Sequence, residues 1–101
     1  MYARVARFEG ARADGIRAVT DEINSAAEPP EGLPSVGILM LADPDNGRTL
    51  TISLFETEED RRKGDETLNA MTPAGGGLGR RTSVEFYDVA VDRRASSSMP
   101  A

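Results

Sequence analysis

Residues 33–57 read LPSVGILMLADPDNGRTLTISLFET. Two β-rich runs, 35–42 and 48–55, lie on either side of five turn-forming residues, Asp-Pro-Asp-Asn-Gly. Pro44 presets φ for a turn and Gly47 tolerates positive φ, while the Asp and Asn side chains can bond their own backbone. The stretch therefore predicts a β-hairpin at the centre of the chain.

One strand and one helix are predicted before the hairpin. Residues 2–8 alternate as a strand does, and Gly10 ends the alternation. From 11 to 27 the apolar period becomes helical, Asp14 is the expected cap, and Pro29 stops the helix. The apolar stripe consists of Ile16, Val19, Ile23, Ala26 and Ala27.

One helix and one strand are predicted after the hairpin. Thr57-Glu-Glu-Asp resembles a capping box and begins a mostly polar helix to about Met71. Residues 72–81 are rich in Gly but lack the Gly-Lys-Ser/Thr ending of a phosphate loop, which favours a mobile connection over a ligand lid. A strand over 82–91 follows, and the Ser-rich residues 93–101 are predicted to be a disordered tail.

The resulting order, β-α-β-β-α-β, predicts an α+β domain of the ferredoxin-like class over residues 1–92. Its four strands form one antiparallel sheet in the spatial order 4-1-3-2, and both helices cover one face.

Strand alternation also predicts which residues face the helices. Placing Leu50, Ile52 and Leu54 under the helices leaves Phe8, Phe55 and Tyr87 on the opposite face, and the second strand is predicted to be buried on both faces. An exposed apolar sheet face of that size predicts an interaction surface, and a symmetric homodimer is the expected partner arrangement.

Composition narrows the possible functions. The net charge of −5 argues against a nucleic-acid surface, and the chain contains neither histidine nor cysteine. The commonest general base and metal ligand, thiolate nucleophiles and disulfides are therefore excluded. No run is long enough for a membrane span and no signal peptide is recognisable, so a cytoplasmic location is expected.

Three segments carry a resemblance to a known family: GILMLAD at 37–43, TISLFETEED at 51–60 and SVEFYDVAV at 83–91. With them the chain resembles the antibiotic-biosynthesis-monooxygenase-like group of dimeric α+β barrels, whose uncharacterised bacterial members have similar segments. The resemblance implies a homodimer with a cavity for a small aromatic molecule. It also implies two alternatives, a cofactor-independent oxygenase or a non-catalytic ligand-binding or stress-responsive module.

The resemblance suggests ligand-binding residues and argues against haem. Haem-degrading members use an Asn on the first strand, a Trp and an axial His, and this first strand has no Asn and the chain neither Trp nor His. No cofactor or metal is therefore expected. Arg4, Phe55, Asn69 and Tyr87 are the candidate ligand-binding residues, although Arg4 could instead pair with Glu85 on the neighbouring strand. By strand alternation Arg4, Thr51, Ser53, Glu85 and Tyr87 are expected to share the cavity face.

Overall fold

A computed structural model describes residues 1–26, 32–71 and 77–93. The elements are, in order, β1 (Tyr2–Glu9), α1 (Ala13–Ser25), β2 (Gly37–Asp43), a 3₁₀ turn (Pro44–Asn46), β3 (Arg48–Phe55), α2 (Glu58–Ala70) and β4 (Arg80–Asp88). The predicted β-α-β-β-α-β order is confirmed. The predicted tail and most of the Gly-rich connection lie outside the described residues, so the domain boundary at residue 92 stays a prediction.

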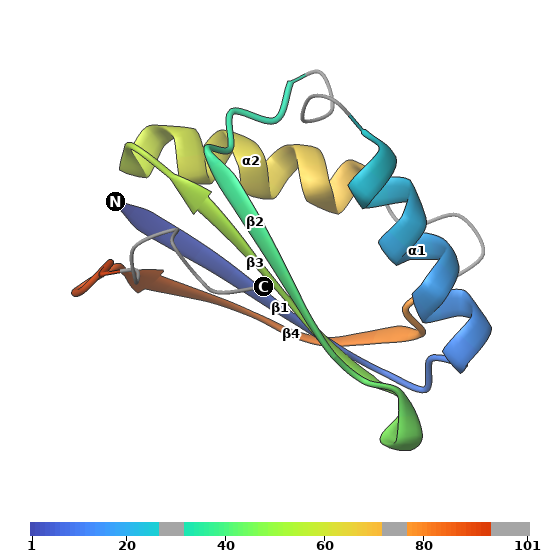
Figure 1. Ribbon diagram of the computed structural model, residues 1–101. Helices are drawn as coiled ribbons and strands as arrows, with labels where there is room; N and C mark the ends of the chain where they lie inside the picture. Colours follow the sequence, from blue (N-terminus) through green and yellow to red (C-terminus); the bar gives the residue numbers. More distant parts are fainter. Residues whose placement is uncertain (27–31, 72–76, 94–101) are drawn as a thin grey trace, which may run out of the picture.

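The four strands form one antiparallel sheet in the order β2-β3-β1-β4, as expected. Both helices lie on the same side of this sheet (Figure 1). The ferredoxin-like arrangement is therefore confirmed, including the central position of β1 and β3.

The central hairpin forms as the turn residues predict. Gly47 has a φ of 66°, and the carboxylate of Asp43 accepts hydrogen bonds from Asn46 at 2.9 Å and from Arg48 at 2.7 Å. The hydrogen bond from Arg48, and then that from Asn46, lowers the pKa of Asp43 below its ordinary value. The side chains on either side of the turn thus close the hairpin in register.

The predicted assignment of sheet faces is wrong for β1 and β3. Arg4 bonds to side chains of α2, and Phe55 contacts the position of Gly64 in the same helix. Alternation and register then place the aliphatic residues on the side without helices, which we call the helix-free face. It comprises Ala3, Val5, Arg7, Leu39, Leu41, Leu50, Ile52, Leu54, Ser83, Glu85 and Tyr87.

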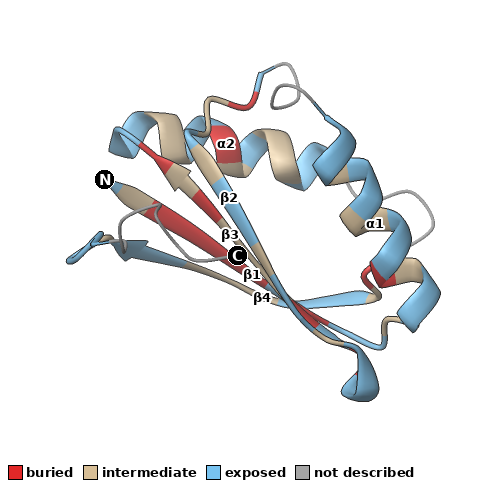
Figure 2. Ribbon diagram, in the orientation of Figure 1, coloured by how far each residue is buried: buried red, intermediate tan, exposed pale blue. Residues whose placement is uncertain are grey.

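The buried residues follow β1 and β3 through the centre of the sheet (Figure 2). At one end Phe55 is fully buried beneath α2, next to Gly64 and near Leu33. At the other end Phe8, Ile16 and Leu78 form a cluster with Ala6. The core therefore has two parts, one under each helix.

The prediction that the second strand is buried on both faces is wrong for the single chain. β2 is an edge strand, and the exposed fractions of Ile38, Leu39 and Leu41 are 46%, 49% and 54%. An edge strand with apolar side chains on both faces is unusual for an isolated domain, because it leaves apolar area in contact with water.

Helix α2 begins as its sequence predicts, whereas α1 does not. Thr57 precedes α2, and its hydroxyl oxygen accepts a hydrogen bond from the backbone N–H of Asp60 at 3.0 Å. The residue before α1 is Arg12, whose side chain makes no capping bond. Asp14 lies inside the first turn and accepts from the N–H of Gly15, so it is not the cap.

Replacing Thr57 by Ala is expected to lower the free energy of unfolding by about 1 kcal/mol, because the hydroxyl satisfies one of the free N–H groups at the start of α2. Chemical denaturation measures this change. Thr57→Ser keeps the acceptor and should stay close to wild type, and an equal loss for both variants would contradict the capping role.

Candidate functional site

A hollow of about 470 Å³ lies between the sheet and the helices. Most of its wall is apolar and is formed by residues of β1, β2, α1 and α2 and of the segments next to α2 and β4. These residues are Phe8, Ile23, Ile38, Leu68, Met71 and Leu78. The polar side chains among the described lining residues are two arginines and two hydroxyl residues, Arg4, Arg81, Thr51 and Ser53. A mostly apolar hollow with a few polar groups is typical of a small-molecule site.

Arg4 is the most deeply buried charge in this wall, with an exposed fraction of 4%. Its Nε donates to Oδ1 of Asp65 at 2.8 Å, and its Nη2 donates to Oδ1 of Asn69 at 3.1 Å. Asp65 and Asn69 are four residues apart on α2, which places both on one side of the helix. Helix α2 therefore fixes the Arg4 side chain by two bonds.

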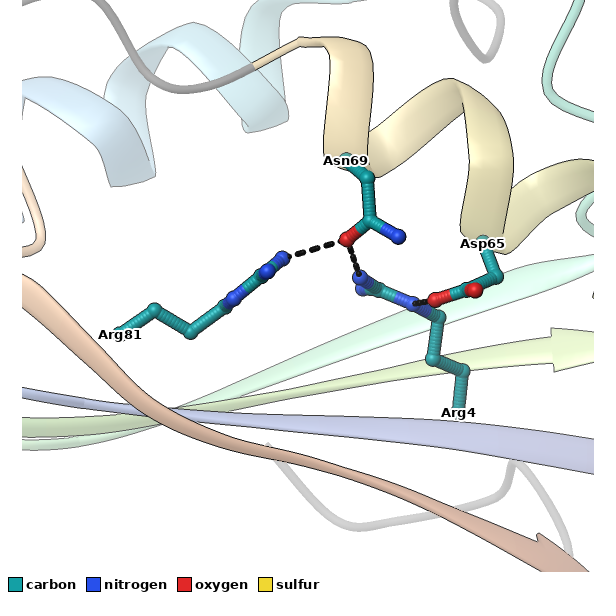
Figure 3. A network of polar contacts seen from close by, with 4 residues as sticks. All are labelled: Arg4, Asp65, Asn69 and Arg81. Carbon is teal, nitrogen blue, oxygen red and sulfur yellow. Dashed lines mark hydrogen bonds and ion pairs between the residues drawn. The ribbon is translucent and has the colours of Figure 1, made fainter.

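Arg81 reaches the same amide from β4. Figure 3 shows the guanidinium groups of Arg4 and Arg81 approaching Asn69 from two strands, and Nη1 of Arg81 donates to Oδ1 of Asn69 at 2.7 Å. One amide oxygen thus accepts from two cations. We call Arg4, Asp65, Asn69 and Arg81 the arginine cluster.

The arginine cluster carries an excess of positive charge. It contains two guanidiniums and one carboxylate, and Asp65 pairs with Arg4. Within the described part of the chain, no carboxylate forms an ion pair with Arg81. The cluster is therefore locally cationic in a chain whose net charge is −5.

A β-bulge explains how Arg81 reaches the hollow. Arg7 is opposite Ser83, but Phe8 is opposite Arg81, so β4 has one extra residue, Thr82, at this point. The hydroxyl of Thr82 donates to the Arg7 carbonyl at 3.4 Å. Because a bulge shifts the alternation of a strand, it directs Arg81 to the helix side, together with Phe8.

The structure brings together two of the four predicted site residues. Arg4 and Asn69 bond to one another, whereas Phe55 is fully buried against α2 and does not line the hollow. Tyr87 lies on the helix-free face, where its hydroxyl donates to Glu85 at 2.9 Å. The assignment of these four residues to ligand binding stays a prediction; of the four, Arg4 lines the hollow and Asn69 is bonded to it.

The predicted pairing of Arg4 with Glu85 is wrong, because the two residues lie on opposite faces of the sheet. Arg7 makes this ion pair instead, at 2.7 Å, and its hydrogen bond is the main reason why the pKa of Glu85 lies below its ordinary value. Glu85 in turn raises the pKa of Tyr87, chiefly through their hydrogen bond. Tyr87 is therefore protonated at neutral pH and unsuited to act as a base. Strand alternation had predicted that Glu85 and Tyr87 share a face with Arg4, Thr51 and Ser53. This prediction is wrong, because Glu85 and Tyr87 lie on the opposite face.

Sequence reasoning missed Asp65 and Arg81. The spacing of Asp65 and Asn69 on a helix was a usable signal, since i and i+4 side chains lie on the same side. Arg81 carried no such signal, because strict alternation along β4 does not reveal a bulge.

A second, shallower hollow lies beside the exposed Phe86 and along α2. The guanidinium of Arg61 lies 5.2 Å from the ring centres of both Tyr2 and Phe86, and it donates to the Tyr87 carbonyl at 3.2 Å. These contacts attach α2 to the ends of β1 and β4. Arg62, a second cation beside this hollow, forms ion pairs with Glu59 and Glu66.

No metal site is evident in residues 1–26, 32–71 and 77–93, where no three acidic, histidine or cysteine side chains gather. Nor does any helix in these ranges have the length and apolar character needed to span a membrane.

Comparison with known proteins supports the fold. No protein-family model matches the chain, and a search of curated proteins also finds no match. Among solved structures, the chain is similar to an arginine-to-serine mutant of MhuD, a crystal structure with two manganese protoporphyrin IX molecules bound per active site. The identity is 16%, the TM-score is 0.57, and the match covers 93% of this chain and 98% of the other. The chain therefore has the same fold as MhuD over almost its whole length, which agrees with the predicted ferredoxin-like arrangement.

Proposed function

We propose that the protein binds a small, largely aromatic molecule in the hollow between the sheet and its two helices. The observation that carries this proposal is the wall of the hollow, whose described residues are mostly apolar and include a fixed, almost fully buried guanidinium. A volume of about 470 Å³ suits a molecule of a few fused or linked rings.

Binding without turnover is the function that these residues support better than oxidation. The polar side chains known to line the hollow carry guanidinium and hydroxyl groups, and none carries a carboxylate, imidazole or thiol; Tyr87 lies on the opposite face. A base would have to come from Asp65, which is already paired with Arg4. Oxygen uptake in the presence of a bound phenol would instead favour the cofactor-independent oxygenase.

The residues do not fit an axially coordinated haem, although the structurally similar MhuD binds a manganese porphyrin. The chain has no histidine and no cysteine, and the polar wall offers guanidinium and hydroxyl groups. Guanidinium groups are always protonated and cannot coordinate a metal. We therefore assign the hollow to an organic molecule without a coordinated metal.

A neutral bicyclic probe, 2-naphthamide, tests the proposed site by isothermal titration calorimetry. Ile38→Trp, at the half-exposed rim of the hollow, is expected to weaken binding at least tenfold, because the larger ring occupies the ligand's space. Val91→Trp is the control, because Val91 is exposed, is not among the residues that line the hollow and lies outside the helix-free face. Equal effects of the two variants, or no binding to the wild type at millimolar probe, would contradict the site.

We further propose that two copies associate through the helix-free face. Apolar residues of β1, β2 and β3 form the larger part of this face, and Leu39 and Leu41 are about half exposed in the single chain. The polar residues Arg7 and Glu85 satisfy one another, so a partner could cover them without leaving an unpaired charge. The predicted cytoplasmic location adds no constraint to either proposal.

A further inference from the structure

We propose that the ligand of the hollow carries a carboxylate attached to its aromatic body, and that Arg81 and Arg4 bind this group. The inference rests on the proposed function, because it names the chemical class of the molecule that occupies the same hollow. It is carried by the arginine cluster, whose two cations face the hollow with only one carboxylate between them.

The two cations differ in what a ligand could offer them. Arg81 is exposed and lines the hollow, and no carboxylate among the described residues pairs with it, so an anion in the hollow would be its partner. Arg4 is 4% exposed, and its Nε and Nη2 groups donate hydrogen bonds to side chains of α2. Its Nη1 group has no acceptor in the part of the chain that the structure describes. This group is a donor available to a ligand.

Asn69 has a positioning role in this arrangement. Its Oδ1 accepts from both guanidiniums at 3.1 and 2.7 Å, which holds two like charges close together that would otherwise repel one another. An aspartate at this position would neutralise the second cation. The amide orients both arginines and leaves their combined charge in place, as a site for an external anion requires.

The donor geometry favours a carboxylate over a single phenol oxygen. Guanidinium N–H groups lie in a planar fork that matches the two oxygens of a carboxylate, and such charge-assisted bonds are stronger than bonds between neutral groups. Arg81 is exposed, so its side chain can turn towards a ligand without disturbing the core, while Arg4 is fixed. The aromatic body would then lie against the apolar wall, which includes Leu68 and Met71.

A matched pair of probes tests the proposal: 2-naphthoate, which is ionised at pH 7, and neutral 2-naphthamide. In calorimetric titrations of the wild-type protein, naphthoate is expected to bind at least tenfold more tightly. Arg81→Gln should reduce this preference at least fivefold, because loss of the charge weakens naphthoate binding more than amide binding. Arg80→Gln is the control, because it removes the same charge from the adjacent residue of β4, which pairs with Glu9 and does not line the hollow.

Asn69→Asp provides a second, independent variant. It places a carboxylate where the two guanidiniums meet, so it should abolish the preference for naphthoate while circular dichroism shows a folded chain. Equal affinities of wild type for the two probes, or a naphthoate preference retained in both Arg81→Gln and Asn69→Asp, would overturn the carboxylate assignment alone. Failure of both probes to bind would overturn the proposed function as well.

Discussion

Replacing Gly64 by Ala is expected to lower the free energy of unfolding by about 2 kcal/mol, with a fall in melting temperature of about 10 °C. A Cβ at this position would lie 2.3 Å from Cε1 and 2.5 Å from Cζ of Phe55, far closer than carbon atoms can approach. The Phe55 ring is fully buried, so it cannot move into solvent. The clash outweighs the roughly 1 kcal/mol by which Ala favours a helix over Gly.

Two variants make this prediction specific. Phe55→Leu removes the ring edge that the new methyl group would meet, so Gly64→Ala should cost much less in the Phe55→Leu background than in the wild type. Gly37→Ala is the control, because its Cβ would meet only the Leu54 side chain, at 3.4 Å from the flexible Cδ1 and 3.9 Å from Cβ, and it should change stability by less than about 0.5 kcal/mol. A melting temperature of Gly64→Ala at or above wild type would show that α2 does not pack on Phe55 as described.

The same contact explains where prediction from the sequence succeeded and where it failed. Turn residues, the capping Thr57 and apolar periodicity are local signals, and they correctly predict the order of elements and the hairpin at Asp43–Gly47. Which face of the sheet the helices cover depends on side chains that meet across the fold. Gly64 has no side chain, so the Phe55 ring can pack against α2 at this position. Asp65 of the same helix accepts a hydrogen bond from Arg4.

The prediction of the sheet faces was wrong because it assigned the aliphatic residues of β3 to the helices and left Phe8 and Phe55 for a partner copy to cover. In a monomer, covering Leu50, Ile52 and Leu54 with helices minimises the apolar area in water. The structure instead places these residues on the helix-free face, and it uses the mostly polar α2 to hold Arg4. The free-energy cost of leaving these apolar side chains in water is removed if a second copy covers the helix-free face.

The candidate site was predictable only in part for a related reason. Arg4 and Asn69 stood out because their types and elements suit a cavity, and the structure brings them together. The position of the Arg81 side chain depends on a register shift between β1 and β4. Tyr87 lies on the opposite face of the sheet from Arg4. Strand alternation alone determines neither position, since one extra residue in a strand reverses the faces beyond it.

The wild-type chain is expected to be a dimer at micromolar concentration, and Leu41→Asp is expected to weaken that dimer by about 10²- to 10⁴-fold. Leu41 lies on the helix-free face with an exposed fraction of 54% in the single chain. Loss of a buried Leu costs about 1.5–3 kcal/mol, and a two-fold symmetric interface contains the substitution twice. Each 1.4 kcal/mol changes the dissociation constant tenfold, which gives the expected range.

Ile38→Asp separates an interface effect from a general effect of a charge on β2. Ile38 is on the same strand and similarly exposed, at 46%, but its register partner is Ser53, so it faces the helix side. It should leave the dimer intact, whereas Leu39→Asp should act like Leu41→Asp. Size-exclusion chromatography with light scattering measures the mass of each variant, and circular dichroism confirms that it is folded. A monomeric wild type, or dissociation by Ile38→Asp alone, would show that two copies do not associate through the helix-free face.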